Sequence, residues 1–462
     1  MRVVFSVALV VGYVAVLTFV AVRARAARKY SEFSLANRTL PLALIFGSLC
    51  ATYVGPAFSI GFVGRGFTSG FLFLGIGLAY ATQNILVGVL VAPRLRALDD
   101  CYTLGDAFGQ RYNRTCHILA GIISVALCAG FATIMAHAGG LVIRNVFDLP
   151  PWSSVTLVAA VTALYTTSGG LRASVITDAF QFAAFALLLP FVLLLTFLNH
   201  LDGGMATFVE QATAATTTGV NSLSSLELLG LVTAVFLGET LIPPYANRAL
   251  ASETTKVSRN GFVLAGVFSV FWFVVMVSIG VVARGVIASE TERDFVLLNL
   301  VRQTIPTEGY ALLLIVIVSI IMSSLDSLLN AGAVAFTQDI VRPVWRLSEA
   351  AALSTGRVAT VAIAAAAAAG AVLVPDIIEA LIRCYTVWAP SILPALVLGL
   401  WLRRPRPLAG ILSMATGALV ALLFQFAVVD RTHATAILPA LGAALLAYAI
   451  GHLLGRANPE KN

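Results

Sequence analysis

Long runs of apolar residues, separated by short polar stretches, dominate the chain. Each run has about 20 residues, the length an α-helix needs to cross the hydrocarbon core of a bilayer. The runs do not alternate between apolar and polar residues, as membrane β-strands do. The pattern therefore predicts an all-α polytopic membrane protein with about thirteen transmembrane helices, at roughly 3–22, 41–63, 70–92, 118–143, 155–167, 174–197, 225–245, 262–283, 309–336, 358–374, 377–402, 409–428 and 435–453.

Composition agrees with this pattern and excludes several classes of protein. Hydrophobic residues make up 59% of the chain and charged residues 11%, with a mean hydropathy of +0.94, whereas a soluble domain carries about 25% charged residues. The longest polar stretches, 199–224 and 284–308, are too short for a nucleotide-binding module. No arrangement of nucleophile, base and acid is visible either. We therefore expect neither an ATP-driven pump nor an enzyme.

The net charge of +7 reflects membrane topology. If the N-terminus lies outside and the C-terminus inside, the inner loops carry 21 of the 29 Lys and Arg residues and the outer ends and loops carry 7. An excess of basic residues on the cytoplasmic side is the usual rule for membrane proteins. We expect a multi-pass protein of the cell membrane with the C-terminus in the cytoplasm. The basic charge gives no reason to expect nucleic acid as a partner.

Two of the expected spans contain helix-breaking residues near their middle. Gly55-Pro56 interrupts the second span, and Gly238-Glu239-Thr240 with Pro243-Pro244 interrupts the seventh. Proline removes a backbone donor and disfavours helix at the preceding residue. Kinks that only help packing are an alternative explanation, because membrane helices often contain glycine and proline.

The two breaks occupy equivalent positions in two groups of five spans. Each break lies about 14 residues into its group, 41–197 or 225–402. An odd number of crossings separates the two starts, so the groups have opposite orientations. Paired broken helices in inverted halves indicate a transport site at the middle of the membrane. Residues 1–40 and 403–462 would then supply one extra helix with a cytoplasmic linker and two extra helices.

The stretch IVSIIMSSLDSLLNAG (317–332) places polar groups inside an apolar span. Ile320, Ser323, Ser324 and Ser327 lie at i, i+3, i+4 and i+7 and share one helix face. Asp326 is one residue off that stripe. Hydroxyl and carboxylate oxygens are hard ligands that suit a small hard cation. Serines that bond back to their own helix are the alternative explanation.

A second intramembrane carboxylate lies in the stretch GGLRASVITDAFQF (169–182). Asp178 falls within the sixth span, next to Thr177. Hydrogen bonds from a side chain to the backbone of its own helix explain serines in a membrane helix. They do not explain two aspartates. Ionisable residues inside a membrane are functional candidates by default, so Asp178 and Asp326 are both candidate site residues.

Four stretches resemble the sodium:solute symporter family, which includes proline, sugar, sialic-acid and choline symporters. They are SSLDSLLNAGAVAFTQDI (323–340), GGLRASVITDAFQ (169–181), SEFSLANRTLPLALIFGSLCATYVG (31–55) and YANRALAS (245–252). The resemblance covers about residues 30–400. It implies the LeuT-type fold, a core of two inverted five-helix repeats with flanking helices.

The resemblance also implies a sodium site shared across the family. Two backbone carbonyls on the first core helix correspond to Ala51 and Val54. A carbonyl on the eighth core helix corresponds to Ile320, and two hydroxyls correspond to Ser323 and Ser324. Na⁺ is therefore the expected coupling ion.

Some family members have a further sodium site, for which the matching positions here are Asp178, Ser323, Asp326 and Ser327. A carboxylate there would offset the charge of the ion in a low-dielectric setting.

The solute site in this fold lies between the two breaks. The candidate side chains there are Phe58, Glu239, Thr240, Tyr53 and Gln83. CATYVG and RCYTVW resemble the choline branch of the family. However, ETLIPPY lacks the tryptophan expected in an aromatic cage for a quaternary ammonium. A solute-facing Glu239 would favour an amine or a hydroxyl-rich solute. The alternative is that Glu239 pairs with a polar neighbour or with Arg383.

The sequence thus predicts sodium-coupled symport of a small polar organic solute, such as an amino acid, carboxylate, sugar or amine, by alternating access. Two alternatives remain open at this point. Protons could replace sodium at Asp178 or Asp326, or the chain could be a membrane-embedded solute sensor. The expected partners are the solute, sodium ions and the lipid bilayer, and a monomer is the expected state.

Overall fold

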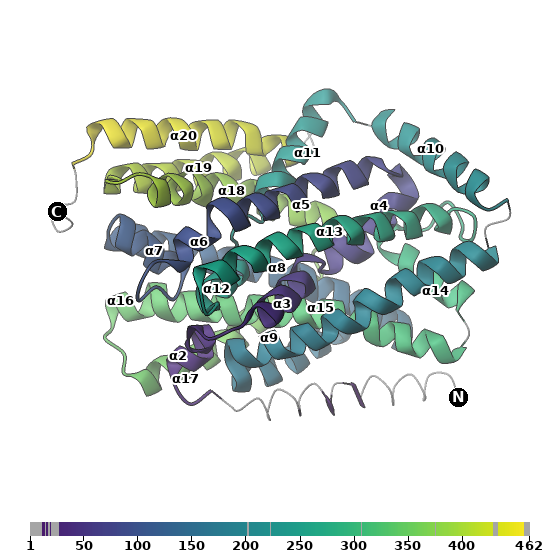
Figure 1. Ribbon diagram of the computed structural model, residues 1–462, viewed down its shortest axis with the longest axis horizontal. Coiled ribbons are helices and arrows are strands. Elements are labelled where there is room, and N and C mark those ends of the chain that lie inside the picture. The colour runs from purple at the N-terminus through teal and green to yellow at the C-terminus, as the bar shows by residue number, and fades with distance from the viewer. Residues whose placement is uncertain are drawn as a thin grey trace.

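The computed structural model describes residues 12, 13, 15, 16, 19, 27–200, 203–221, 223–305, 307–374, 376–427 and 433–456. These residues form helices and no β-strand, which confirms the all-α prediction. Most helices lie roughly along one long direction (Figure 1). In chain order they are α2 (Tyr30–Leu35), η1 (Ala36–Arg38), α3 (Leu42–Tyr53), η2 (Ala57–Gly61), α4 (Phe62–Ser69), α5 (Leu72–Leu90), α6 (Ala92–Arg96), α7 (Leu104–Arg111), α8 (Arg114–Phe147), α9 (Pro151–His200), α10 (Met205–Asn221), α11 (Ser225–Gly238), α12 (Pro243–Ala251), α13 (Thr255–Ala283), η3 (Arg293–Phe295), α14 (Val296–Thr304), α15 (Thr307–Ala335), η4 (Phe336–Val341), α16 (Arg342–Val344), α17 (Glu349–Ala371), α18 (Ile377–Trp401), α19 (Pro407–Ala427), η5 (His433–Ala436) and α20 (Ile437–Leu454).

The described residues do not confirm the predicted number of thirteen membrane spans. Among the described residues, ten helices are long and apolar enough to cross a membrane, or eleven if α3 and the bent η2–α4 segment form one span. The expected first span, 3–22, lies outside the described residues apart from five of its positions. The expected spans 155–167 and 174–197 both fall in α9. The count of thirteen is therefore not confirmed.

Helix α9 is interrupted at Gly170. A straight helix of its 50 residues would be about 75 Å long, more than twice the hydrocarbon thickness of about 30 Å. Gly170 has φ 61° and ψ −162°, a backbone conformation that only glycine adopts readily. A Cβ at this position would lie 2.6 Å from the Cα of Phe33. The break divides α9 into two segments, each long enough to span a membrane.

The first helix break lies where Gly55-Pro56 predicts it. Helix α3 ends at Tyr53, and the helical backbone resumes at η2, with a bend of 58° between the two parts. Pro56 has no N–H, so the carbonyl of Thr52, four residues earlier, cannot form its usual helical hydrogen bond. The Cys50 carbonyl still accepts from the Val54 N–H at 3.1 Å, but the carbonyls that follow it lie at the end of the helix, where helical partners run out.

The second break separates α11 from α12. Helix α11 ends at Gly238 and α12 begins at Pro243, where a proline is tolerated because the first N–H of a helix needs no helical partner. Between them, Leu241 has φ 47°, a left-handed conformation that is uncommon outside glycine. Both breaks therefore expose backbone groups in the middle of an apolar span.

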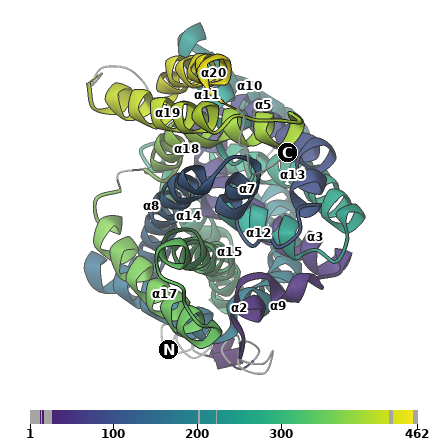
Figure 2. The ribbon, with the colours of Figure 1, turned by 90° about the vertical axis from the view of Figure 1, so that its left-hand side faces the viewer.

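Helix α15 carries the predicted Ser-Ser-Leu-Asp-Ser stretch and lies in the interior of the bundle. In an 18-residue window of the span 314–344, 94% of the residues are buried, compared with 33% in α19 and 28% in α20. Viewed from one end, α19 and α20 lie at the periphery and α15 lies among other helices (Figure 2). The hydroxyls and the carboxylate of α15 thus face protein.

Arginines at one end of the bundle bind the carbonyls of helix ends. Positive charge at a helix C-terminus interacts favourably with the helix dipole, so these residues contribute to packing as well as to topology. Arg38 donates to the carbonyls of Arg96 and Leu98, and Arg96 donates to those of Ser252 and Glu253. Arg111 donates to the carbonyls of Gly399 and Leu402, and Arg406 donates to those of His452, Leu453 and Gly455.

Substitution of Gly170 by alanine should lower thermal stability. The strained backbone costs about 1–3 kcal/mol, and the new Cβ would press on Phe33. Gly204 also has a positive φ, 58°, but has nothing within 4 Å of its Cβ position. Melting of the detergent-purified protein should therefore show a clearly larger loss for Gly170→Ala than for Gly204→Ala. Equal losses would show that the contact with Phe33 is unimportant.

Candidate functional site

The break in α3 lies directly against α15. A Cβ added to Gly55 would lie 2.7 Å from the Oγ of Ser324. The Ser324 hydroxyl is buried and has no hydrogen-bond partner among the residues that the structure describes. A buried hydroxyl without a partner is costly, so this oxygen is available to a ligand. The last carbonyls of α3, including that of Ala51, belong to the same interrupted turn.

The other residues of the predicted shared sodium site have partners or lie within regular helix. Ser323 donates to Asp178 Oδ1 at 2.7 Å. The carbonyl of Val54 accepts from the Ser59 hydroxyl at 2.5 Å and retains a second lone pair. Ile320 is fully buried in the continuous helix α15.

Asp178 forms a buried ion pair with Arg248. Arg248 Nη2 lies 2.8 Å from Asp178 Oδ2, and both side chains have no exposed surface. Arg248 also donates to the hydroxyls of Ser48 at 2.8 Å and Ser327 at 2.5 Å, and to the carbonyl of Pro244 at 2.8 Å. Ser48 donates in turn to Asp178 at 2.6 Å. The guanidinium therefore joins α3, α9, α12 and α15.

Asp326 contacts hydroxyl groups only. It accepts hydrogen bonds from Ser174 at 3.0 Å, Ser327 at 3.1 Å and Tyr165 at 3.2 Å. Tyr165 and Ser174 lie on opposite sides of the Gly170 break, so this carboxylate connects the two parts of α9. Within the described parts of the chain, no basic side chain lies within ion-pair distance of Asp326.

The two aspartates and Arg248 form one connected network. Ser327 accepts from Arg248 and donates to Asp326, so it links the ion pair to the second carboxylate. One guanidinium balances one carboxylate. If both aspartates are ionised, one negative charge remains at Asp326 in a low-dielectric interior, where an unpaired charge is expensive. A cation or a proton at Asp326 would remove that cost.

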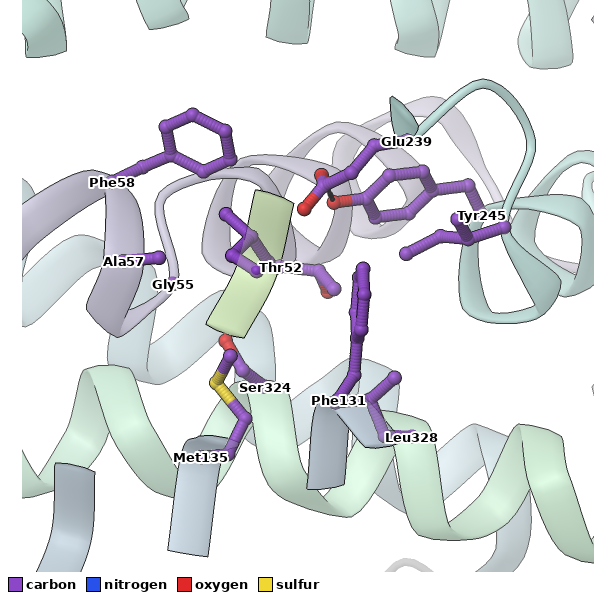
Figure 3. Close-up of a pocket in the computed structure, with 12 residues that line it drawn as sticks. Thr52, Gly55, Ala57, Phe58, Phe131, Met135, Glu239, Tyr245, Ser324 and Leu328 are labelled. Carbon is purple, nitrogen blue, oxygen red and sulfur yellow. Dashed lines mark hydrogen bonds between the residues drawn. The ribbon is translucent and has the colours of Figure 1, made fainter. Parts of the chain in front are cut away.

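A narrow pocket lies between the two helix breaks and α15 (Figure 3). About 20 Å³ of it is accessible to the centre of a water molecule, which is room for one or two waters. An organic solute therefore requires the surrounding helices to move apart. The lining includes Gly55, Phe58, Phe131, Glu239, Tyr245 and Ser324.

Three tyrosines surround the carboxylate of Glu239. Tyr80 and Tyr245 donate to Oε2, and Tyr385 donates to Oε1 at 2.6 Å. Glu239 is 5% exposed. Arg383 instead pairs with Glu379 at 2.6 Å. Of the predicted alternatives for Glu239, pairing with polar neighbours is thus observed, and pairing with Arg383 is not.

The remaining predicted solute residues lie around the same carboxylate. Phe58 packs on Tyr80, with ring centroids 4.3 Å apart, and Tyr53 packs edge-on against Tyr245 at 4.6 Å. Gln83 donates to the Thr240 hydroxyl at 3.0 Å. Of these residues, Phe58 and Glu239 line the pocket, whereas Tyr53, Gln83 and Thr240 lie outside its lining.

Two features of this site were missed by sequence reasoning. Arg248 was counted among the loop charges, although it follows Pro243-Pro244 by only a few residues and is fully buried. In the tyrosine shell of Glu239, Tyr80 and Tyr385 lie 159 and 146 positions from the carboxylate that they contact. A clue was available for Arg248, because two intramembrane aspartates need a counter-charge.

This architecture defines a secondary membrane transporter, because two broken helices face a polar helix around a closed pocket. Residues 33–422 match the sodium:solute symporter family, and the chain belongs to this family. It is accordingly a transporter and not an enzyme, as the sequence predicts.

Individual relatives are distant. The Escherichia coli sodium/pantothenate symporter is 23% identical over 93% of this chain and 92% of its own length. The E. coli symporter YidK is also 23% identical, and the match covers 72% of this chain and 61% of YidK. A solved Na⁺-coupled sialic acid symporter superimposes with a TM-score of 0.86 at 15% identity, covering 98% of both chains. That likeness shows the LeuT-type fold.

Removal of the Arg248 charge should strongly destabilise the protein. Arg248→Met leaves Asp178 buried without its cation, at a cost of about 3–5 kcal/mol. The double variant with Asp178→Asn should recover part of this loss, because no unpaired charge remains. Arg383→Met, which breaks an exposed pair, should cost about 0–1 kcal/mol. Thermal melts of the unmodified protein, Arg248→Met, Asp178→Asn, the double variant and Arg383→Met check the expectation, and additive losses at Arg248 and Asp178 would contradict it.

Proposed function

We propose that the chain couples sodium entry to the uptake of a small organic solute bearing an amino group. The observation that carries the sodium assignment is the unpartnered Ser324 hydroxyl next to the broken end of α3. Sodium symport is the activity for which the family is named, and the names of the pantothenate symporter and the sialic acid symporter include it.

The first sodium ion would bind between α3 and α15. The carbonyls of Ala51, Val54 and Ile320 and the hydroxyls of Ser323 and Ser324 are its ligands in this proposal. Carbonyl and hydroxyl oxygens are the donors that suit such a hard cation. An ion there would tie α15 to the interrupted turn of α3 and so favour one arrangement of the two helices.

A second positive charge would be accommodated near Asp326. The predicted residues Asp178, Ser323, Asp326 and Ser327 all belong to the buried network, but Arg248 already balances Asp178. Asp326 therefore supplies the free charge, with Ser327 and the hydroxyls of Ser174 and Tyr165 as further oxygen donors. A proton at Asp326 is the competing occupant. Movement of Arg248 away from Asp178 would add a second carboxylate to this site.

The solute assignment follows from Glu239. Its carboxylate faces the pocket, and within the described residues its hydrogen-bond partners are hydroxyls, with no basic side chain in ion-pair distance. Three hydroxyl donors stabilise the carboxylate but do not neutralise it. Phe58, Phe131 and Tyr245 line the same pocket, and the faces of aromatic rings attract cations. An ammonium group would thus complete the site.

Coupling between ion and solute is a shared binding free energy. Ser324 and Glu239 line the same small pocket. An ion bound at Ser324 would therefore change the space that is open to a solute at Glu239. By thermodynamic linkage, sodium and solute must tighten each other's binding by the same factor. Rocking of one helix group against the other would then expose the pocket to each side in turn.

The membrane orientation and domain division remain part of this proposal. The charge distribution supports a cell-membrane protein with its N-terminus outside and its C-terminus in the cytoplasm. In that orientation α6, α7 and α16, which lie at one end of the bundle (Figure 1), face inward, and α10 and α14 face outward. Residues 41–197 and 225–402 would be the two repeats, and a monomer would be sufficient for transport.

Sodium, but not potassium, should raise the melting temperature of the purified protein. Ser324→Ala and Asp326→Asn should each reduce sodium affinity roughly ten- to hundredfold, because a hydrogen-bonding or ligand contact to a charged group contributes about 1.5–3 kcal/mol. Ser269→Ala is the matched control, since its buried hydroxyl bonds only to Ala265 in its own helix. An unchanged sodium response in both site variants would rule out these ion positions.

The protein should bind solutes that carry an amino group more tightly than solutes that lack one. In sodium buffer, an amino acid should shift the melting temperature more than the 2-hydroxy acid of the same carbon skeleton. Glu239→Gln should remove that preference, because the amide keeps the shape and loses the charge. Glu227→Gln, at an exposed helix cap, should leave it intact. Equal responses to the two solutes in the unmodified protein would refute the amine assignment while leaving sodium coupling untouched.

A further inference from the structure

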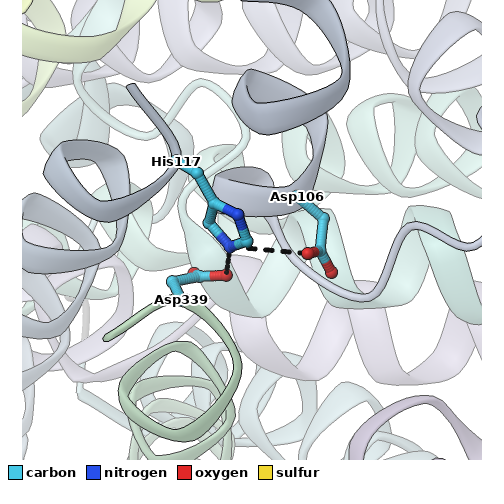
Figure 4. A group of neighbouring side chains, drawn as sticks. All are labelled: Asp106, His117 and Asp339. Atoms are coloured by element: carbon cyan, nitrogen blue, oxygen red, sulfur yellow. Dashed lines mark hydrogen bonds and ion pairs between the residues drawn. The ribbon is translucent and has the colours of Figure 1, made fainter. Parts of the chain in front are cut away.

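Asp106, His117 and Asp339 converge at the end of the bundle that the proposed topology places inside (Figure 4). His117 Nε2 lies 2.9 Å from Asp339 Oδ1 and 3.4 Å from Asp106 Oδ1. The side chains of Asp106 and His117 are 10% and 15% exposed, and that of Asp339 is fully buried. The three residues come from α7, α8 and η4. This group is separate from the ion and solute sites described above.

Neighbouring groups hold both carboxylates in place. Thr103 caps α7 by accepting from the Asp106 N–H, and its hydroxyl donates to Asp339. Gln338 donates to both carboxylate oxygens of Asp106, at 3.2 and 3.1 Å. Gln338 and Asp339 lie in the π-helical turn η4, a distortion that often marks functional sites. The arrangement is therefore pre-organised by partners outside the cluster itself.

One oxygen of the cluster has no partner. Asp339 Oδ2 is buried and accepts no hydrogen bond from the described part of the chain. Gly105 and Gly121 lie against this side chain, so closely that a Cβ on either residue would collide with it. A buried carboxylate oxygen normally has a partner. The unpaired oxygen is a second indication, independent of the clustering, that a ligand belongs here.

The positive groups nearby are engaged elsewhere. Arg342 donates to Gln338 at 3.0 Å and pairs with Glu349 at 2.6 Å. Arg114 donates to the carbonyl of Pro343. Among the described residues, His117 is the one basic side chain within ion-pair distance of Asp106 and Asp339. Two ionised carboxylates would exceed the single charge that His117 can carry.

We propose that Asp106, His117 and Asp339 bind a divalent transition-metal ion, with Zn²⁺ as the best match. One imidazole nitrogen and two carboxylate oxygens form a ligand set that zinc accepts, and the three ligand atoms lie within 4.8 Å of one another. Calcium, by contrast, takes six to eight oxygens. Three protein ligands leave one zinc position open, so the site would exchange its metal instead of holding it permanently.

Metal binding would restrain the helix that carries the sodium ligands. η4 directly continues α15, and the other two ligands lie on α7 and α8. A bound ion would join these three elements and hold the inner end of the bundle closed. Zinc would therefore inhibit transport from the inner side. This consequence, unlike metal binding itself, rests on the proposed transport function.

Cobalt provides a direct test, because Co²⁺ bound at a zinc site absorbs visible light. The full-length purified protein should bind one Co²⁺ with a visible absorption band, and one equivalent of Zn²⁺ should displace it. His117→Gln should weaken cobalt and zinc binding at least roughly tenfold, since even changes outside the ligand shell cost about that much. His137→Gln is the control, because His137 contacts the carbonyl of Ala371 instead.

Folding of the variants must be shown separately. The sodium-dependent thermal shift should persist in His117→Gln, and Asp106→Asn provides a second ligand variant if that protein does not fold. Loss of cobalt absorption in His117→Gln, with the sodium response retained, would support the metal site. The same spectrum in His117→Gln and the unmodified protein, or no stoichiometric cobalt binding at all, would overturn it. Neither result depends on the solute being known.

Discussion

Arg248 supplies the positive charge around which the buried polar core is arranged. Its guanidinium contacts Ser48 on α3, Asp178 on α9 and Ser327 on α15, and it lies on α12 itself. The two broken helices and the serine-bearing helix therefore meet at one side chain. Without it, Asp178 would be an isolated charge in an apolar interior, which is far more costly than the same charge in a pair. This contact also lies next to Ser323, which shares Asp178 with Arg248 and belongs to the proposed sodium site.

The helix breaks and the ion pair act together. Each break frees backbone groups that water cannot reach, and such groups need internal partners in a membrane. The Val54 carbonyl receives the Ser59 hydroxyl, and Ser59 in turn accepts from the indole of Trp272 at 3.2 Å. Ser324 remains without a partner at the same break. The chain thus satisfies part of the broken backbone with its own side chains and leaves oxygens where a cation would bind.

Much of the fold was predictable because its signals are local. Apolar runs of spanning length define helices, Gly55-Pro56 and Pro243-Pro244 define the breaks, and the polar stripe on α15 identifies a helix that must face protein. The exact point at which α9 is interrupted, between the spans expected at 155–167 and 174–197, depends on the conformation of Gly170, which the apolar pattern does not encode. Contacts between segments that are distant along the chain also could not be predicted from the sequence. Arg248 and Asp178 are 70 residues apart, and His117 and Asp339 are 222 apart, so their pairing required the three-dimensional arrangement.

Polar side chains also meet at the two ends of the bundle. At the end that the proposed topology places outside, Arg65 and Asp376 lie 3.4 Å apart with 17% and 21% of their side chains exposed. Burial, together with the charge of neighbouring Asp376, raises the pKa of Asp294 to about 6, so its ionisation at neutral pH disfavours this arrangement of the outer end.

At the end that the proposed topology places inside, hydrogen bonds join Asp106, Thr103, His117 and Asp339. A buried polar network loses stability when one partner is withdrawn, because each separated group is left without water or a replacement. In the proposed orientation this network would have to separate before a solute could leave on the inner side, and the binding of ions and solute would supply the energy for that step.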